Sequence, residues 1–307
     1  MTHQCFLCNP SNRDRIVDAS TVVFAEGFVG PPERAHGGIA VGALTCPALR
    51  HAAESGVENP IVEHVSGRLR APVPLTKPLQ VRVREGNPIK VDLCDGDDVV
   101  VSGRVSVVDR QAIPDMVIKA PPEELSAHLG ELSDLADINL EGPTYMQRYA
   151  RFGKERGIEK QVEISCYGCS EKAHALKLHN RVTEGGDLWT RWETEPYYID
   201  APGRLATSMV TAALDCSNLL VLNAREPELS LRMRLEEKKL WITGTHSVHF
   251  LRVPHIEGDY RVMTRFLRQE GRKGFTMTAL LDRDGVVFAV GEAISILIDI
   301  PPEMELQ

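Results

Sequence analysis

Two segments of the chain place different reactive groups on a helix built from small residues. Residues 30–44, "GPPERAHGGIAVGAL", carry His36 and two glycines, whereas residues 201–215, "APGRLATSMVTAALD", end on Asp215. Unpaired N–H groups at a helix start can stabilise a developing oxyanion, because they lie at the positive end of the helix dipole. A carboxylate in an apolar helix is costly unless a partner or a function compensates. Stabilisation of a developing negative charge by the helix start, and proton transfer by the carboxylate, are the chemistry that these residue types could perform.

The two segments are copies of one unit. Residues 33–46, "ERAHGGIAVGALTC", align without a gap to residues 203–216, "GRLATSMVTAALDC", at an offset of 170 positions. Each copy is expected to form a buried helix that follows a strand and precedes several alternating strands joined by Asp-Gly-type turns. Pro47 is expected to kink the helix of the first copy near Ala43 to Cys46, whereas the second copy has Ser217 there. This order predicts an α+β unit that occurs twice.

The repeat divides the chain into three parts. We expect an N-terminal domain over residues 1–112, a helical crossover linker over residues 113–160 and a C-terminal domain over residues 161–307. Within the linker, "PPEELSAHLGELSDL" and "PTYMQRYARFGKERG" each predict a short helix that packs on the outside of the domains.

The ordered motifs "CFLC", "GPPERAHGG", "LRAPVPL" and "DGDDVV" resemble the hotdog-fold acyl-CoA thioesterases, in particular the PaaI-like branch of the phenylacetate pathway. The resemblance covers both repeats. It implies two hotdog domains in tandem, each an antiparallel sheet wrapped around a central helix, paired as a pseudo-dimer with one continuous sheet. It also implies an acyl-CoA substrate, with no metal and no other cofactor.

In that family the acid lies nine positions after the histidine, and the neighbouring hotdog supplies it. Nine residues span about 13 Å along one helix, so both groups of one helix cannot reach the same carbonyl. Here the position nine after His36 is Thr45, whereas the position nine after Ala206, the counterpart of His36, is Asp215. The resemblance therefore predicts one composite catalytic site of His36, Gly37 and Asp215, and a second, inactive one around Thr45.

The same resemblance suggests the residues that contact the substrate. A helper hydroxyl of the family falls at Gly244, which Thr243 and Thr245 flank, and basic residues on a later turn would meet the phosphates of coenzyme A. The acyl chain is expected between the helices, beside Ala40, Ala43, Ala212 and Ala213. The expected substrate-binding residues are Gly38, Thr245, Arg272 and Lys273.

Other cysteines and histidines are expected to be structural. Cys5/Cys8 and Cys166/Cys169 form two C-x2-C pairs, 161 positions apart (166 − 5), which mark equivalent places in the repeats. A zinc ion shared by both pairs, or a redox role, is the alternative. Two further expectations concern pairs of residues. Cys46 and Cys216 should be small buried packing residues, and His246 and His249 should lie on an exposed or half-exposed strand face.

Composition excludes several classes of protein. The net charge of −8, without a long Lys/Arg run, argues against a nucleic-acid binder. The N-terminus lacks a signal-peptide core, no window suggests a membrane span, and the seven cysteines are sparse, so a cytoplasmic location is expected.

Two other functions and two assembly states stay open. A non-catalytic protein that binds acyl-CoA or an acyl carrier is the first alternative function, and a hotdog hydratase is the less favoured one. A pseudo-dimeric monomer and a homo-oligomer of tandem hotdogs are both compatible with the repeat.

Overall fold

The computed structural model describes residues 20–30, 34–110, 118–135, 140–157, 166–170, 175–201, 203–224 and 227–300. Cys5 and Cys8 lie outside these residues, as do the outer ends of both predicted domains. Within the described part, none of the helices is long and apolar enough to cross a membrane.

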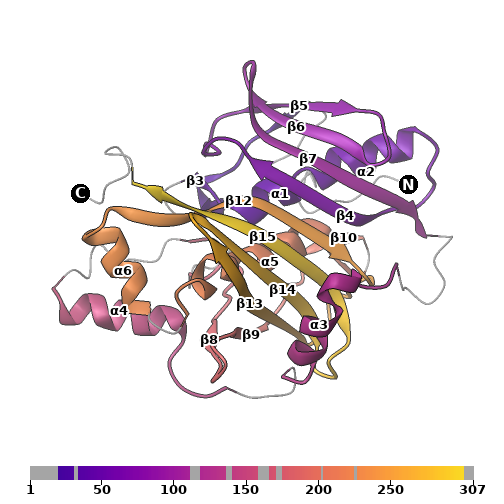
Figure 1. Ribbon diagram of the computed structural model, residues 1–307. Coiled ribbons are helices and arrows are strands. Elements are labelled where there is room, and N and C mark those ends of the chain that lie inside the picture. The colour runs from indigo at the N-terminus through magenta and orange to yellow at the C-terminus, as the bar shows by residue number, and fades with distance from the viewer. Residues whose placement is uncertain are drawn as a thin grey trace.

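One antiparallel sheet runs through both repeats (Figure 1). Its N-terminal half contains, in spatial order, β1 (Thr21–Val22), β5 (Leu79–Arg84), β6 (Ile89–Asp95), β7 (Asp98–Asp109) and β4 (Pro60–Leu69). Its C-terminal half continues with β12 (Lys239–Phe250), β15 (Val287–Asp299), β14 (Lys273–Asp282), β13 (Tyr260–Glu270), β9 (Leu188–Trp192) and β8 (Arg181–Val182). Two short ribbons, β2 (Val29–Gly30) with β3 (Arg34–Ala35) and β10 (Ile199–Ala201) with β11 (Arg204–Leu205), precede the central helices.

The halves join where equivalent strands meet. β4 precedes "LRAPVPL" and β12 precedes the matching "LRVPHIEG", so the two strands correspond in the repeat. They pair antiparallel, with Val65 opposite Val248 and Ser66 opposite Ser247. Because this pairing closes the edge of each half, it converts two sheets into one.

A central helix lies against each half of the sheet. In the first repeat it is interrupted: α1 (Gly37–Gly42) ends before α2 (Thr45–Glu54) begins. The kink predicted from Pro47 is confirmed, since proline cannot donate to the carbonyl of Ala43. In the second repeat α5 (Thr207–Val221) runs without a break.

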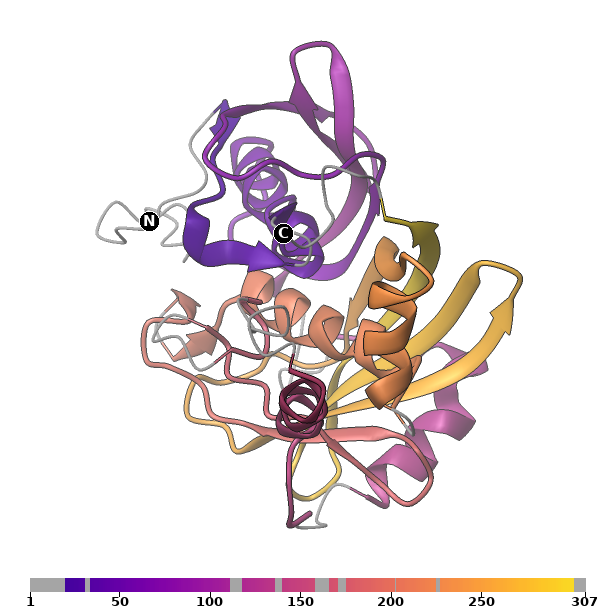
Figure 2. The same cartoon turned by 90° about the vertical axis from the view of Figure 1, so that its left-hand side faces the viewer.

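The connecting segment contributes helices to the outside of the C-terminal half (Figure 2). A 3-10 turn (Glu123–Leu125) leads into α3 (Ser126–Ser133), whose buried leucines pack with residues of β13, β14 and β15. Thr144 and Gln147 form a capping box at the start of α4 (Tyr145–Glu155), which packs near α6 (Pro227–Leu235). Both helices predicted for the linker are confirmed.

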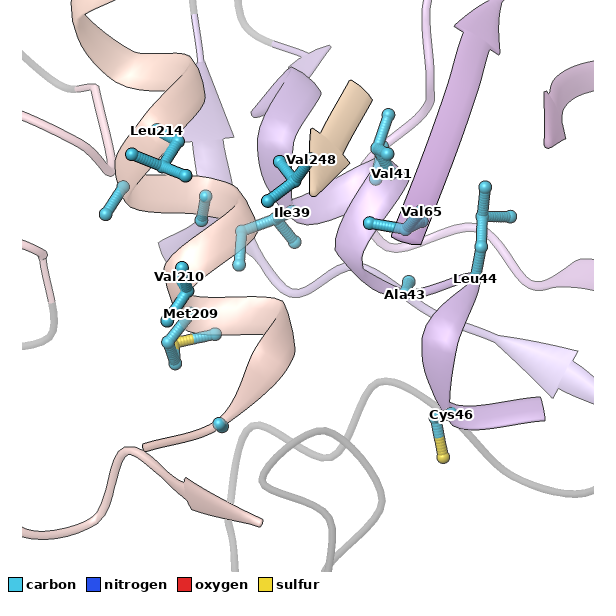
Figure 3. Close-up of a cluster of buried hydrophobic side chains, with 14 of the residues drawn as sticks. Ile39, Val41, Ala43, Leu44, Cys46, Val65, Met209, Val210, Leu214 and Val248 are labelled. Carbon is cyan, nitrogen blue, oxygen red and sulfur yellow. The ribbon is translucent and has the colours of Figure 1, made fainter. Parts of the chain in front are cut away.

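The main core fills the space between the central helices and the sheet. Figure 3 shows Ile39 and Val41 on α1 and Leu214 on α5, together with Val65 and Val248 from the paired strands. All five side chains are fully buried. The two halves therefore share one continuous core, which holds α1 and α5 side by side.

Candidate active site

Asp215 lies on α5 in the second repeat, but part of the first repeat holds its carboxylate. The backbone N–H of Gly38, at the start of α1, donates to Oδ2 at 2.7 Å, and the hydroxyl of Thr243 on β12 donates to Oδ1 at 3.1 Å. Asp215 is 3% exposed. Both carboxylate oxygens are thus satisfied, which offsets part of the cost of burying the group.

Glycines allow α1 and α5 to approach closely enough for this contact. A Cβ added to Gly38 would lie 2.6 Å from the Cβ of Asp215 and 2.7 Å from the Cα of Ala212. A Cβ on Gly42 would lie 2.9 Å from the carbonyl oxygen of Ser208. Gly38 and Gly42 correspond to Ser208 and Ala212 in the repeat, so the two contacts are related by the pseudo-twofold axis.

His36 occupies the N-cap position of α1, but its side chain makes no capping hydrogen bond. Its Nδ1 lies 3.8 Å from Oδ2 of Asp215, and the residue is 4% exposed. Burial lowers the pKa of His36, but contact with the Cys166 thiol, together with the charges of Cys166 and Asp215, outweighs it and raises the pKa above its usual value. The ring therefore lies between the Asp215 carboxylate and a cysteine of the second repeat.

Gly37 is the first residue of α1, and no earlier turn of that helix can accept from its N–H. A Cβ at this position would lie 3.0 Å from Oδ2 of Asp215 and 3.3 Å from Oγ1 of Thr243. A side chain at this position would thus crowd the carboxylate and Thr243. The structure brings the three predicted catalytic residues, His36, Gly37 and Asp215, into one cluster.

The hydroxyl in this cluster comes from Thr243 and not from Thr245. The pairing of β12 with β15 shifts between these two threonines, which indicates a β-bulge at Gly244. His246, the neighbour of Thr245, faces α5, so Thr245 faces the opposite side of the sheet. The sequence pointed to both threonines, but periodicity alone could not show where a bulge changes the face.

Two further polar residues near the carboxylate were missed or misplaced. Ser295 lies opposite Thr243 on β15 and is fully buried, and its Oγ has no hydrogen-bond partner among the described residues. His246 is also fully buried and donates from Nε2 to the carbonyl oxygen of Thr211 at 3.0 Å, so the expectation of an exposed histidine was wrong. Burial lowers the pKa of His246, with the charge of Asp215 opposing this effect.

The other predicted substrate-binding residues do not lie together. The backbone N–H of Gly38 is bonded to Asp215, and Gly38 packs against α5. Arg272 and Lys273 are exposed at the turn between β13 and β14. Gly274, the next residue, shares a row of the sheet with Ser295 and Thr243, so this turn lies two strand spacings, about 10 Å, from Thr243.

The pseudo-symmetric counterpart of the site has no acid from the opposing helix. The hydroxyl of Thr45, at the start of α2, donates to the carbonyl oxygen of Gly42, at the end of α1, at 2.7 Å. At the start of α5, the N–H and the hydroxyl of Thr207 both donate to Asp200, at 3.3 Å. Asp200 corresponds to Gly30 in the first repeat. The start of α5 therefore has a carboxylate beside it where the start of α1 has a glycine.

Small residues between the helices serve close packing. The four alanines expected beside the acyl chain are fully buried, and Ala212 lies against Gly38. A surface cavity of about 480 Å³ lies elsewhere, beside Trp192, Thr194 and Ile256, and none of its lining residues belongs to the Asp215 cluster.

Comparison with known proteins identifies the architecture. No family model and no curated protein matches the sequence. Among solved structures, the chain is similar to the tesB protein of Mycobacterium avium subspecies paratuberculosis, with 14% identity and a TM-score of 0.53, over 93% of this chain and 94% of that one. It is also similar to the acyl-CoA thioesterase II TesB2 of Mycobacterium marinum, with 14% identity and a TM-score of 0.50, over 87% of this chain and 90% of that one.

At such low identity these similarities establish the fold, and the PaaI-like branch stays a prediction. They extend over both repeats, as the single sheet and the two central helices also require. The chain therefore has a tandem hotdog fold, the architecture predicted from its duplicated motifs.

Proposed function

We propose that the protein hydrolyses an acyl-CoA thioester at a single composite site between the two hotdogs. The observation that carries this proposal is the position of the Asp215 carboxylate, which Gly38 of the opposing repeat and Thr243 of its own repeat hold together. The names of the two similar structures fit the same chemistry, since one is called an acyl-CoA thioesterase II.

In the proposed reaction, Asp215 acts as a general base toward water. The water oxygen bonds to the thioester carbonyl carbon as its proton passes to the carboxylate. The N–H of Gly37 stabilises the resulting oxyanion at the positive end of α1. The C–S bond then breaks, and the proton passes from Asp215 to the departing thiolate, which leaves a carboxylic acid and free coenzyme A.

The remaining residues of the proposed site position these groups. Thr243 and His36 orient the carboxylate, and Gly38 fixes it against α1. Direct attack by Asp215 to form an anhydride is the other route to the same products. Arg272 and Lys273 provide exposed positive charge for the coenzyme A phosphates on the adjacent turn.

The test is hydrolysis of short, aromatic and long acyl-CoAs by the wild type, by Asp215→Asn and by the matched control Thr45→Ala. Removing the base should lower kcat/KM by about 10²- to 10⁴-fold. Thr45 occupies the equivalent position in the first repeat, and its hydroxyl bonds to Gly42 of the same repeat, so its variant should keep wild-type activity.

A different outcome would support the non-catalytic alternative. The burial of Asp215 is the observation that favours it, because a carboxylate with both oxygens bonded can be purely structural. A wild type that binds acyl-CoA in calorimetry and hydrolyses none of the panel would overturn the thioesterase proposal.

A further inference from the structure

Three metal-binding side chains lie together beside the proposed site, and a fourth adjoins two of them. The donor atoms of His36, Cys166 and Cys216 all lie within 4.8 Å of one another. Cys169 is the fourth, and its thiol is in hydrogen-bonding contact with those of Cys166 and Cys216. All three cysteines are free thiols, two of them buried and Cys166 half-buried.

The histidine presents one particular nitrogen to the thiols. Nδ1 is buried without a hydrogen bond and faces Asp215, so the contact with Cys166 falls to Nε2. Nε2 also lies 3.3 Å from the position that a Cβ on Gly168 would take, inside the turn between Cys166 and Cys169.

The turn that carries the C-x2-C pair is built to approach Cys216. A Cβ on Gly168 would lie 2.2 Å from Sγ of Cys216, so only glycine fits at this position. Two backbone hydrogen bonds fix the turn: the N–H of Ser170 donates to the carbonyl oxygen of Cys166, and the N–H of Leu178 donates to that of Gly168. The donors are therefore placed by three separate elements of the fold, namely this turn, the start of α1 and the middle of α5.

From this geometry we infer that His36, Cys166, Cys169 and Cys216 form a tetrahedral zinc site. Zinc at about 2.3 Å from sulfur and about 2.0 Å from nitrogen places its ligand atoms roughly 3.7 Å apart. The three donors that lie within 4.8 Å of one another reach this spacing with small movements, and Cys169 completes the set by moving toward His36. A Cys₃His set is a closed structural site, and thiolate and imidazole ligands favour zinc over magnesium or calcium.

The surroundings of the histidine fit the same assignment. Metal-bound histidines generally direct their second ring nitrogen at a carboxylate or a carbonyl, which fixes the ring. Here Nδ1 lies 3.8 Å from Oδ2 of Asp215, on the side of the ring away from the thiols. The metal would thus link the two repeats, because His36 comes from the first hotdog and the three cysteines come from the second.

The zinc that the sequence suggested involved different partners. In that prediction, Cys166 and Cys169 shared a zinc ion with Cys5 and Cys8, which lie outside the described residues. The described structure instead completes the second pair with His36 and Cys216, which were expected to serve catalysis and packing.

The experiment measures zinc per chain by mass spectrometry of the purified full-length protein, expressed with zinc and without an affinity tag. Compared with the wild type, Cys216→Ala and Cys166→Ser should each lose about one equivalent of zinc. The control Cys94→Ala removes a buried thiol on β6, outside the cluster, and should keep the wild-type content. Because each variant is compared with the wild type, zinc bound elsewhere in the chain contributes equally to both values.

A second measurement identifies the ligands. Cobalt(II) added to the metal-free protein should give thiolate charge-transfer absorption in the wild type and in Cys94→Ala, and a clear loss of that absorption in Cys166→Ser. Circular dichroism reports whether each variant is folded. Cys166 is the half-buried member of the cluster and lies outside the central helices, so its variant keeps the test usable if Cys216→Ala fails to fold.

Two results would overturn the inference. One is wild-type metal content in a folded Cys166→Ser variant. The other is a wild type that takes up neither zinc nor cobalt, with thiol titration then distinguishing free cysteines from a disulfide. Neither result depends on hydrolysis, so the zinc site and the proposed thioesterase activity can fail separately.

Discussion

At the scale of single residues, Asp215 is notable for what surrounds it. A buried carboxylate is retained only when donors compensate for lost hydration, and here a backbone N–H and a hydroxyl each take one oxygen. Each oxygen keeps a further lone pair. The arrangement therefore fixes the orientation of the carboxylate without exhausting its capacity to accept a proton.

The role of the hydroxyl is testable with two neighbouring threonines. Thr243→Val keeps the side-chain volume and removes the donor to Oδ1, so kcat should fall about tenfold or more while KM changes little. Thr245→Val makes the same chemical change on the opposite face of β12. Steady-state kinetics in which both variants lose activity equally would contradict the assignment of Thr243.

Residue types revealed part of this site. The resemblance to hotdog thioesterases, applied to the offset of 170 positions, predicted that His36 and Asp215 meet, because each repeat carries one half of the pattern. Cys216 gave no such signal, since a cysteine in an apolar helix is usually a packing residue. Its partners follow only from the tertiary path of the turn that contains Gly168.

At the scale of elements, the contact between α1 and α5 determines whether the composite site exists. The helices meet through Gly38 and Gly42, where any side chain would overlap the opposing backbone. The hydrogen bond from Gly38 to Asp215 depends on this short separation. Packing and the proposed chemistry are therefore coupled at one residue.

A pair of glycine substitutions tests this coupling. Gly38→Ala should destabilise the protein by about 3 kcal/mol, because its Cβ would overlap Asp215 and Ala212. Gly130→Ala, at an exposed position of α3 with open space around it, should instead stabilise by about 0.5–1 kcal/mol. Urea unfolding measures both. Equal effects at the two sites would show that the helix contact is loose.

Elements were predictable where their determinants are local. Pro47 was sufficient to predict the break between α1 and α2, and the Thr144/Gln147 box starts α4 where the linker pattern placed a helix. The bulge at Gly244 was not predictable in the same way, because a bulge depends on the register of the partner strand β15.

At the scale of the whole molecule, the junction between the hotdogs carries a histidine pair. His64 on β4 stacks on His249 of β12, with ring centroids 4.3 Å apart, and hydrogen-bonds to Ser247 at 2.8 Å. Burial lowers the pKa of His64 to about 4, assisted by the charges of His249 and Lys119 and opposed by Glu292. The folded junction therefore favours the neutral form of His64.

This junction should make stability depend on pH. Between about pH 6.5 and pH 4 the unfolded chain binds a proton at His64 that the folded chain does not, so stability should decline as the pH falls through this range. Solvent screening limits the loss to the order of 1 kcal/mol. His64→Gln should flatten the profile of unfolding free energy between about pH 7 and pH 5. A variant with an unchanged slope would assign the dependence to other groups.

The pairing of β4 with β12 also has an evolutionary consequence. In a homodimer of single hotdogs, any substitution alters both symmetry-related sites at once, so losing the acid from one site would remove it from the other. Joining the copies in one chain releases this constraint, because each copy carries its own codons. His36 could then persist opposite Asp215 while Ala206 and Thr45 diverged together, without any intermediate in which both sites were lost.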